Sequence, residues 1–194
     1  MLGKVELSLE MSDFLLGSGL REIEKRVNAY WMTVTTDFNL TPNVLSYSIT
    51  GSPISRTAFK EIYFASWRVN GTSKWSPLPH RSYELLNNQF DSSEAGEPRA
   101  CAVDNVTLFI FPNPIKNYEV RLHSFEWTTL PADNVTAATE VMARFPEALL
   151  YGAAMVGTVL LTKSEEAAKP WANLLNVQIP MIQKASDGRI KRVQ

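Results

Sequence analysis

The sequence has 194 residues, of which 45% are hydrophobic and 20% are charged, and a formal net charge of -1 at pH 7. These proportions fit an ordinary globular domain and exclude a disordered or fibrous protein. The small net charge gives no overall basic field, which excludes strong sequence-independent binding to duplex DNA as the main activity of the chain.

The chain opens with a short alternating segment and continues into a predicted helix over residues 12–30. Residues 4–10 alternate polar and apolar side chains, which fits a short strand or an extended arm. The apolar residues that then recur at helical spacing are Leu16, Leu20, Ile23, Val27 and Tyr30. The solvated face of this helix is expected to consist of Arg21, Glu22, Glu24, Lys25 and Arg26.

The middle of the chain, residues 31–127, is expected to be mainly β. Runs of β-branched and aromatic residues between turn signals predict strands at residues 31–38, 45–50, 59–69, 100–103, 106–111 and 118–127. The third strand ends at the turn signal Asn70-Gly71, and a short helix is expected over residues 80–90. The last three strands are expected to form one antiparallel group that packs against a helix or another subunit.

Residues 143–184 predict two helices joined by a short polar turn, the most organised part of the sequence. Pro146 suits a first helical turn, where a missing backbone N–H is tolerated. The residues expected to form the apolar packing face are Leu150, Ala153, Gly157 and Leu160, with both leucines in the core. Gly152 and Gly157 add no side chain to this face, so that a neighbouring backbone can come close. A partner helix or subunit is therefore expected.

The second helix of the pair is predicted to begin after Ser164, to kink near Pro170 and to end near Pro180, because proline lacks an N–H and clashes with the preceding turn. Residues 185–194 are then expected to form an extended tail after the turn signal Asp187-Gly188. The tail residues that combine positive charge with apolar anchors are Arg189, Ile190, Lys191, Arg192 and Val193. This composition suits a docking arm.

The residue types that carry catalysis or metal binding are sparse. His80 and His123 lie in no nucleophile motif, and two histidines with one cysteine do not supply a zinc site. No phosphate-binding glycine loop appears. Cys101 lies in a predicted strand, where a buried apolar role is favoured, and a lone cysteine fits a reducing compartment. The sequence thus predicts no enzyme, no cofactor and no metal site.

Secretion and membrane insertion are not indicated. Residues 1–16 lack the basic and apolar regions of a secretory signal. The longest apolar run, residues 149–161, is shorter than the roughly 20 residues that a membrane-spanning helix needs. This run is better interpreted as a core helix.

Together these patterns predict an α+β fold. The N-terminal helix and the C-terminal helical hairpin are expected to form a bundle, with an antiparallel β-sheet or flattened barrel inserted between them in the sequence. The whole chain, residues 1–194, is interpreted as one domain.

Several sequence phrases, in this order, resemble the head-to-tail adaptor proteins of tailed bacteriophages, also called head completion or portal adaptor proteins. The phrases are a helix ending in a tryptophan-containing strand (residues 19–38), Trp67-Arg68-Val69-Asn70-Gly71, Gly96-Glu97-Pro98 before a hairpin, a strand ending at Pro112, the segment Pro146 to Ala153, and a later helix with Trp171. Cys101 stands where an aromatic residue is common in the family, and the prolines of the last helix are a further departure. The resemblance covers most of the chain.

The resemblance implies a structural virion protein at the head-tail interface, assembled in the host cytoplasm. It implies a ring, dodecameric by analogy with the portal, that binds the portal protein and a distal tail or nozzle protein. Genomic DNA would pass through the ring without sequence-specific recognition. It also implies that the C-terminal segment reaches the portal.

Two other interpretations remain open at the level of sequence. One is another neck or tail-tube component. The other is a receptor-binding module that binds carbohydrate with its tryptophans, since indole rings stack on sugars. Against the latter, Trp31, Trp67 and Trp127 are expected to pack between sheet and helices, and Trp75 and Trp171 to lie at contacts.

Overall fold

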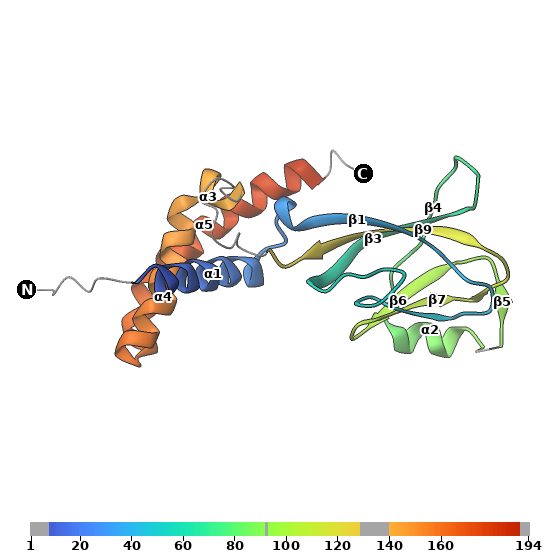
Figure 1. Cartoon of the computed structure of the whole chain (residues 1–194), viewed down its shortest axis with the longest axis horizontal. Coiled ribbons are helices and arrows are strands. Elements are labelled where there is room, and N and C mark those ends of the chain that lie inside the picture. The colour runs from blue at the N-terminus through green and yellow to red at the C-terminus, as the bar shows by residue number, and fades with distance from the viewer. Residues whose placement is uncertain (1–7, 92, 129–139, 191–194) are drawn as a thin grey trace, which may run out of the picture. The chain divides into compact units, whose positions relative to one another are not determined.

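The computed structural model describes residues 8–91, 93–128 and 140–190, and these form helices and antiparallel sheets (Figure 1), as the α+β prediction requires. The chain divides into two compact units. One unit, residues 1–32 and 127–194, contains the helices α1, α3, α4 and α5, and the other, residues 33–126, contains the strands and α2. The strand-rich segment is therefore inserted in sequence between the two parts of the helical unit.

The first helix, α1, covers Leu9–Arg26. The Ser8 hydroxyl accepts a hydrogen bond from the Met11 N–H at 3.2 Å and so caps the helix. The prediction of a helix over residues 12–30 was thus wrong at both ends. The helix already includes Leu9 and Glu10, and after Arg26 the backbone becomes extended at Val27. A separate 3-10 turn, Tyr30–Met32, then leads into the strands.

The helical hairpin consists of α4, Pro146–Thr162, and α5, Glu165–Ile190, and α3, Glu140–Arg144, precedes it. As predicted, Pro146 lies in the first turn of α4, and the Ser164 hydroxyl accepts a hydrogen bond from the N–H of Ala167 at 3.3 Å. Lys163, between the helices, adopts the left-handed conformation that ends α4.

The last helix does not stop at Pro180, so the predicted helix end and the extended tail from residue 185 were wrong. Both Pro170 and Pro180 lie inside α5. A proline inside a helix costs about 3 kcal/mol, but burial of an apolar side chain stabilises by about 1.5–3 kcal/mol. Leu175 and Ile182, on either side of Pro180, are both fully buried. Their packing offsets the proline cost, and α5 continues to Ile190.

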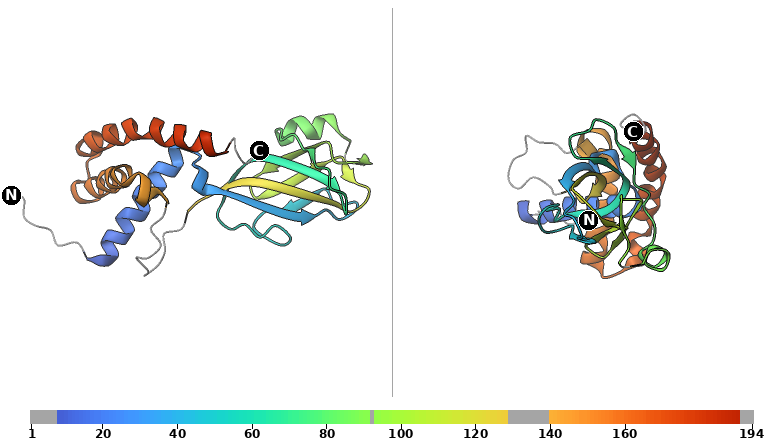
Figure 2. Two further views of the ribbon diagram at one scale, coloured as in Figure 1. Left: turned by 90° about the horizontal axis from the view of Figure 1, so that it is seen from above. Right: turned by 90° about the vertical axis from the view of Figure 1, so that its right-hand side faces the viewer.

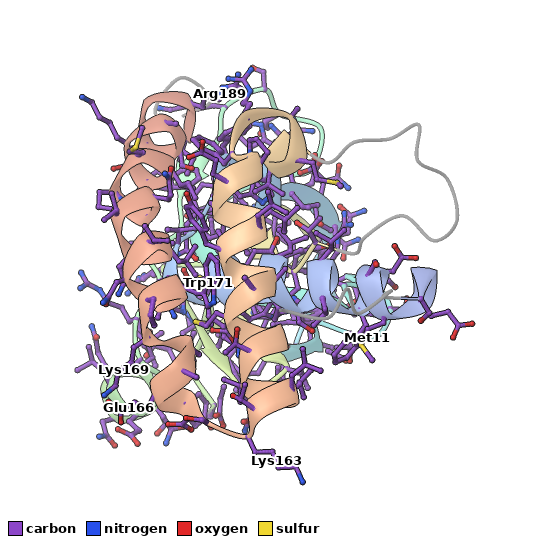
Figure 3. The ribbon with its side chains drawn as sticks, turned by 90° about the vertical axis from the view of Figure 1, so that its left-hand side faces the viewer. Met11, Lys163, Glu166, Lys169, Trp171 and Arg189 are labelled. Carbon is purple, nitrogen blue, oxygen red and sulfur yellow. The ribbon has the colours of Figure 1, made fainter. Side chains whose placement is uncertain are left out.

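The helical unit is held together where α1 crosses α4 (Figures 2 and 3). The two helices meet backbone to backbone at Gly19 and Gly152, where a Cβ on Gly19 would lie 2.5 Å from the backbone nitrogen of Ala153. This contact is the close approach that the small residues of the hairpin predicted. It lies at Gly152 rather than at Gly157, whose added Cβ would lie 3.5 Å from the methyl groups of Leu15, an ordinary contact distance.

The expectation that Leu150 and Leu160 lie in the core was wrong. Their side chains are 59% and 52% exposed, whereas Ala153 and Gly157 are buried. Leu150 follows Leu149, which is buried, by 100° around the helix and so points away from α1. Leu160 lies in the last turns of α4, beyond the level at which Gly157 contacts Leu15.

The strand unit contains two main antiparallel sheets. The four-stranded sheet has the order β1-β9-β3-β4, and the three-stranded sheet the order β2-β7-β6. The strand bounds are β1 Thr33–Asn39, β2 Ser46–Ser48, β3 Phe59–Val69, β4 Ser76–Pro77, β6 Ala100–Asp104, β7 Thr107–Phe111 and β9 Tyr118–Glu126. The short strands β5, Ala95–Gly96, and β8, Asn113–Pro114, pair in parallel.

The predicted strands exist, but the last three do not form one group. β6 and β7 pair as a hairpin, whereas β9 pairs with β1 and β3 in the other sheet. The reason lies in the core: Val120 and Leu122 of β9 face the other sheet, where Leu108 and Ile110 of β7 join the same buried cluster. The helix α2, Tyr83–Gln89, covers the other side of the hairpin through Leu86 (Figure 1).

We expect Gly19→Ala to lower the free energy of unfolding by about 1–3 kcal/mol, because the new methyl group must push two backbones apart. Urea unfolding followed by far-ultraviolet circular dichroism measures this. Gly188→Ala is the matched control: no atom lies within 4 Å of the added Cβ, and the better helix propensity should stabilise α5 by about 0.5–1 kcal/mol. Equal stability of wild type and Gly19→Ala would show that the crossing can relax freely.

Candidate functional site

The helix α5 has a second apolar face that nothing in the described residues covers. This face, here called the α5 seam, consists of Pro170, Leu174, Val177 and Met181, all of them exposed. Their spacing of four, three and four residues places them on one stripe of the helix. The buried residues Ala168, Leu175, Ile182 and Ser186 form a different stripe. Only one of the two faces therefore packs within the chain.

An aromatic pair lies beside the seam and joins α5 to α4. The rings of Tyr151 and Trp171 stack with centroids 6.4 Å apart, and Figure 3 shows Trp171 between the two helices. Further along the hairpin, the amide of Gln178 donates a hydrogen bond to the carboxylate of Glu147 at 3.4 Å. These contacts fix α5 against α4 and hold the seam outward.

A smaller apolar surface, here called the α1 patch, consists of Met11 and Phe14 in the first turns of α1. Both side chains are exposed, Phe14 by 55%. The carboxylates of Glu10 and Asp13 are also exposed on the same turns. Apolar side chains at the free end of a helix, bordered by charges, are typical of contacts with another chain.

The outer face of the four-stranded sheet carries a balanced set of charges. The Arg121 guanidinium donates two hydrogen bonds to Asp37, at 2.8 and 2.6 Å, and Arg68 donates one to Glu119 at 2.6 Å. The ring of Trp75 lies against both arginines, with guanidinium carbons 4.5 and 4.4 Å from its centroid. Because each arginine is already neutralised by a carboxylate, this face fits a structural role rather than an anion site.

A buried carboxylate on α1 was missed by the sequence analysis, which assigned Glu24 to the solvated face. The side chain is fully buried. It accepts hydrogen bonds from the backbone N–H of Thr128 at 3.2 and 3.3 Å, and Arg21 lies 3.5 Å away. Burial raises the pKa of Glu24 above its ordinary value, although the Thr128 bonds and Arg21 oppose this shift. The helical pattern could not show that the chain returns to this point after β9.

Of the residues predicted to dock on a portal, Arg189 and Ile190 form the end of α5 rather than an extended arm. The Arg189 guanidinium carbon lies 4.2 Å from the ring centroid of Tyr30, so this side chain packs on the 3-10 turn. Lys191, Arg192 and Val193 lie outside the described residues. Their role in docking stays a prediction.

The residues considered for catalysis are held in structural contacts. Cys101 is fully buried, as predicted, and burial raises its pKa to about 12. His123 contacts the hydroxyl of Thr35 at 3.0 Å, and burial lowers its pKa. No set of three His, Cys, Asp or Glu side chains within the described residues gathers as a metal site would.

The five tryptophans take part in separate packing contacts. Trp67 packs edge-on against Tyr118, Trp31 contacts Tyr30 and Phe145, and Trp127 lies under Arg21. Each of these rings is used in a separate contact within its own unit, Trp75 lies against Arg68 and Arg121, and Trp171 stacks on Tyr151. These contacts fit the expectation that the rings pack within the protein, and they give no support to the carbohydrate-binding interpretation.

The chain matches the model of a known family. The model of a family described as SU10 adaptor protein matches residues 4–192 of the chain. No curated protein matches the chain. Within the part of the chain that the structure describes, no helix has the length and apolar character needed to cross a membrane.

We expect the stability of the wild type, relative to Glu24→Gln, to fall as the pH rises. The folded state holds the Glu24 proton more tightly than the unfolded state, since its pKa is raised. The loss should therefore begin near the ordinary glutamate pKa of about 4.3 and end above the raised pKa, with a slope of at most about 1.4 kcal/mol per pH unit. Urea unfolding between pH 4 and 8 measures this, with Glu22→Gln as a control for the loss of one charge. A constant difference between wild type and Glu24→Gln would contradict a raised pKa.

The ion pair on the sheet should show the opposite dependence on pH. The hydrogen bonds from Arg121 hold the pKa of Asp37 below its ordinary value, so its contribution is present above the ordinary aspartate pKa, about 3.9, and lost as the pH falls through the folded pKa. We expect Asp37→Asn to cost about 0.5 kcal/mol at pH 7, since the pair is partly solvated, and nothing at low pH. Urea unfolding over a range of pH measures the difference in stability between wild type and Asp37→Asn. A difference that persists at pH 2 would contradict a lowered pKa of Asp37.

Proposed function

Because the chain belongs to the SU10 adaptor protein family, a family of bacteriophage head-tail adaptors, we propose that it forms a ring that binds the portal and joins the head to the tail. Membership makes it a structural adaptor protein of the virion that interacts with other head or tail components. The ring, the portal and the distal tail or nozzle protein as partners, and the absence of catalysis are parts of the proposal.

The observation that carries the proposal is the extent of the family match. It runs over residues 4–192 and so includes both the helical unit and the strand unit. An adaptor that shares both units is expected to share the way in which it assembles.

The exposed apolar surface of the helical unit supports assembly. Leu174, Val177 and Met181 of the α5 seam remain in contact with water in the single chain. Complete burial of a fully exposed side chain of this kind stabilises by about 1.5–3 kcal/mol, and these partly exposed side chains would gain a share of that on association. Repeated contacts of one kind between neighbours close into a ring when the rotation per copy divides a full turn, and a twelve-fold portal would select twelve copies.

The charge of the chain suits a ring through which DNA passes. The formal net charge is -1, so the protein offers little overall attraction to the phosphate backbone. Genomic DNA could then move through the channel without being held, and without sequence-specific recognition. The proposed role is to extend the portal channel rather than to bind DNA.

Portal docking is proposed for the C-terminal segment that follows α5. Lys191 and Arg192 bring two positive charges and Val193 an apolar anchor, directly after Ile190. Arg189 is already packed on Tyr30, so the docking contacts are assigned chiefly to the residues beyond the helix. Such a segment can bind an acidic groove or add to a strand of its partner.

We expect removal of residues 191–194 to weaken binding to purified portal particles while leaving the melting temperature unchanged, because the truncated protein keeps the whole described helix α5, Glu165–Ile190. Cosedimentation of the adaptor with portal, beside differential scanning calorimetry, measures both. Lys163→Ala removes a positive charge at the opposite end of α5 and is the matched control. Undiminished binding by the truncated protein would remove this segment from the interface. If the intact chain does not bind portal, the proposed function itself fails, and the location of the labelled protein in virions decides whether it is another neck or tail-tube component.

A further inference from the structure

We propose that neighbouring copies associate head to tail, with the α1 patch of one copy packed on the α5 seam of the next. This inference rests on the proposed ring and names the two faces that meet in it. Both faces belong to the helical unit, which is compact in itself.

The α5 seam has the geometry of a helix-packing face. Pro170, Leu174, Val177 and Met181 follow the four-three-four spacing that keeps side chains in line along two heptads. Val177, in the middle of the seam, is 67% exposed. A row of this kind accepts another helix by interdigitation of side chains, and a flat polar partner would leave the row exposed.

The α1 patch supplies matching side chains. Met11 and Phe14 are three residues apart, so they lie on one side of the first turns of α1. A methionine side chain adapts to an irregular surface, and a phenylalanine brings a large apolar area. Both lie outside the crossing of α1 with α4, which uses Leu15 and Gly19.

The charges beside the two surfaces are complementary. Glu10 and Asp13 border the α1 patch, and in the described part of the chain neither has an ion-pair partner. Lys184 continues the α5 seam three residues beyond Met181 and is likewise unpaired within the described ranges. Lys169, at the other end of the seam, is already paired with Glu166 at 2.9 Å. The seam therefore offers a positive charge at the end where Lys184 lies, and the patch offers two negative charges to meet it.

The two surfaces lie on opposite sides of the helical unit. Figure 3 shows Met11 at the end of α1 that projects beyond α4, whereas α5 forms the other side. A single copy therefore cannot bring its own patch onto its own seam. Contact between two different faces of identical copies is heterologous, which is the arrangement that generates rings.

The competing arrangement is a two-fold pairing of α5 seams. Antiparallel seams would place Leu174 opposite Val177, but this pairing uses the same face on both copies, closes at a dimer and leaves Met11 and Phe14 exposed. It also brings no acidic residue of α1 to Lys184. The charges and the second apolar surface favour the head-to-tail arrangement.

The test is disulfide cross-linking in the assembled state, on portal particles. Phe14→Cys and Val177→Cys are made singly and together in the full chain. The native Cys101 is fully buried, so it serves as an internal control. Mild oxidation of the double variant should give a ladder of covalent oligomers on a denaturing gel, whereas neither single variant should cross-link. Dimers from Val177→Cys alone would overturn the proposal in favour of paired seams.

Wild-type binding to portal is measured in parallel so that the two failures can be told apart. If the wild type does not bind portal, the proposed function fails. If it binds but the double variant gives no ladder, the head-to-tail contact fails while the adaptor role stands. Val106→Cys, at an exposed apolar position of the strand unit (50% exposed), paired with Phe14→Cys controls for random collisions and should not cross-link.

A charge exchange provides a second test with a different readout. Asp13→Lys should weaken association between copies by about two- to fivefold, the effect of one partly solvated ion pair. Lys184→Asp in the same chain should restore it, because every interface then regains one opposite pair. Sedimentation at several protein concentrations, with portal present, measures both changes. If Lys184→Asp fails to restore association, Asp13 and Lys184 do not face each other across the interface. That result would overturn the proposed pairing of charges.

Discussion

The structure of the helical unit depends on the contact between the backbones of α1 and α4 at Gly19 and Gly152. A side chain at either position would push the helices apart, because a Cβ there would lie 2.7 Å or less from backbone atoms. At this crossing α1 stays close enough to the hairpin for Arg26 to reach Met155 of α4 and Asn176 of α5. Gly19 and Gly152 thus determine where α1 packs on the hairpin of α4 and α5.

The same crossing explains why α5 presents an apolar face to water. α5 packs against α4, α1 and the 3-10 turn, and its residues Leu175 and Ile182 are fully buried. No third layer covers the seam within the described helices. For an isolated chain this arrangement exposes apolar area and favours association with other proteins. For a subunit of a larger assembly it provides a ready interface. The exposed seam thus connects the local packing of the helices with membership of an adaptor family.

In the strand unit, by contrast, the charged side chains on the outer face of the four-stranded sheet pair with one another. Asp37, Arg121, Arg68 and Glu119 form two ion pairs around Trp75. A face that is already neutral and covered by an aromatic ring gains little from a charged partner. Contacts of this unit with other virion proteins would have to use different residues. Among the described residues, it is the helical unit that lines up exposed apolar side chains on one helix face, the α5 seam.

The sequence alone determined the class and most of the elements: the strand at residues 59–69 and the starts of the two helices after Pro146 lie where periodicity and turn signals predicted them. These features depend on residues that are close in the sequence, so local sequence patterns predict them. Tertiary structure decided the rest. The partner strands of β9, the burial of Glu24 and the continuation of α5 through Pro180 each depend on contacts with distant segments. Local propensity is worth a few kcal/mol at most, and such contacts can exceed it.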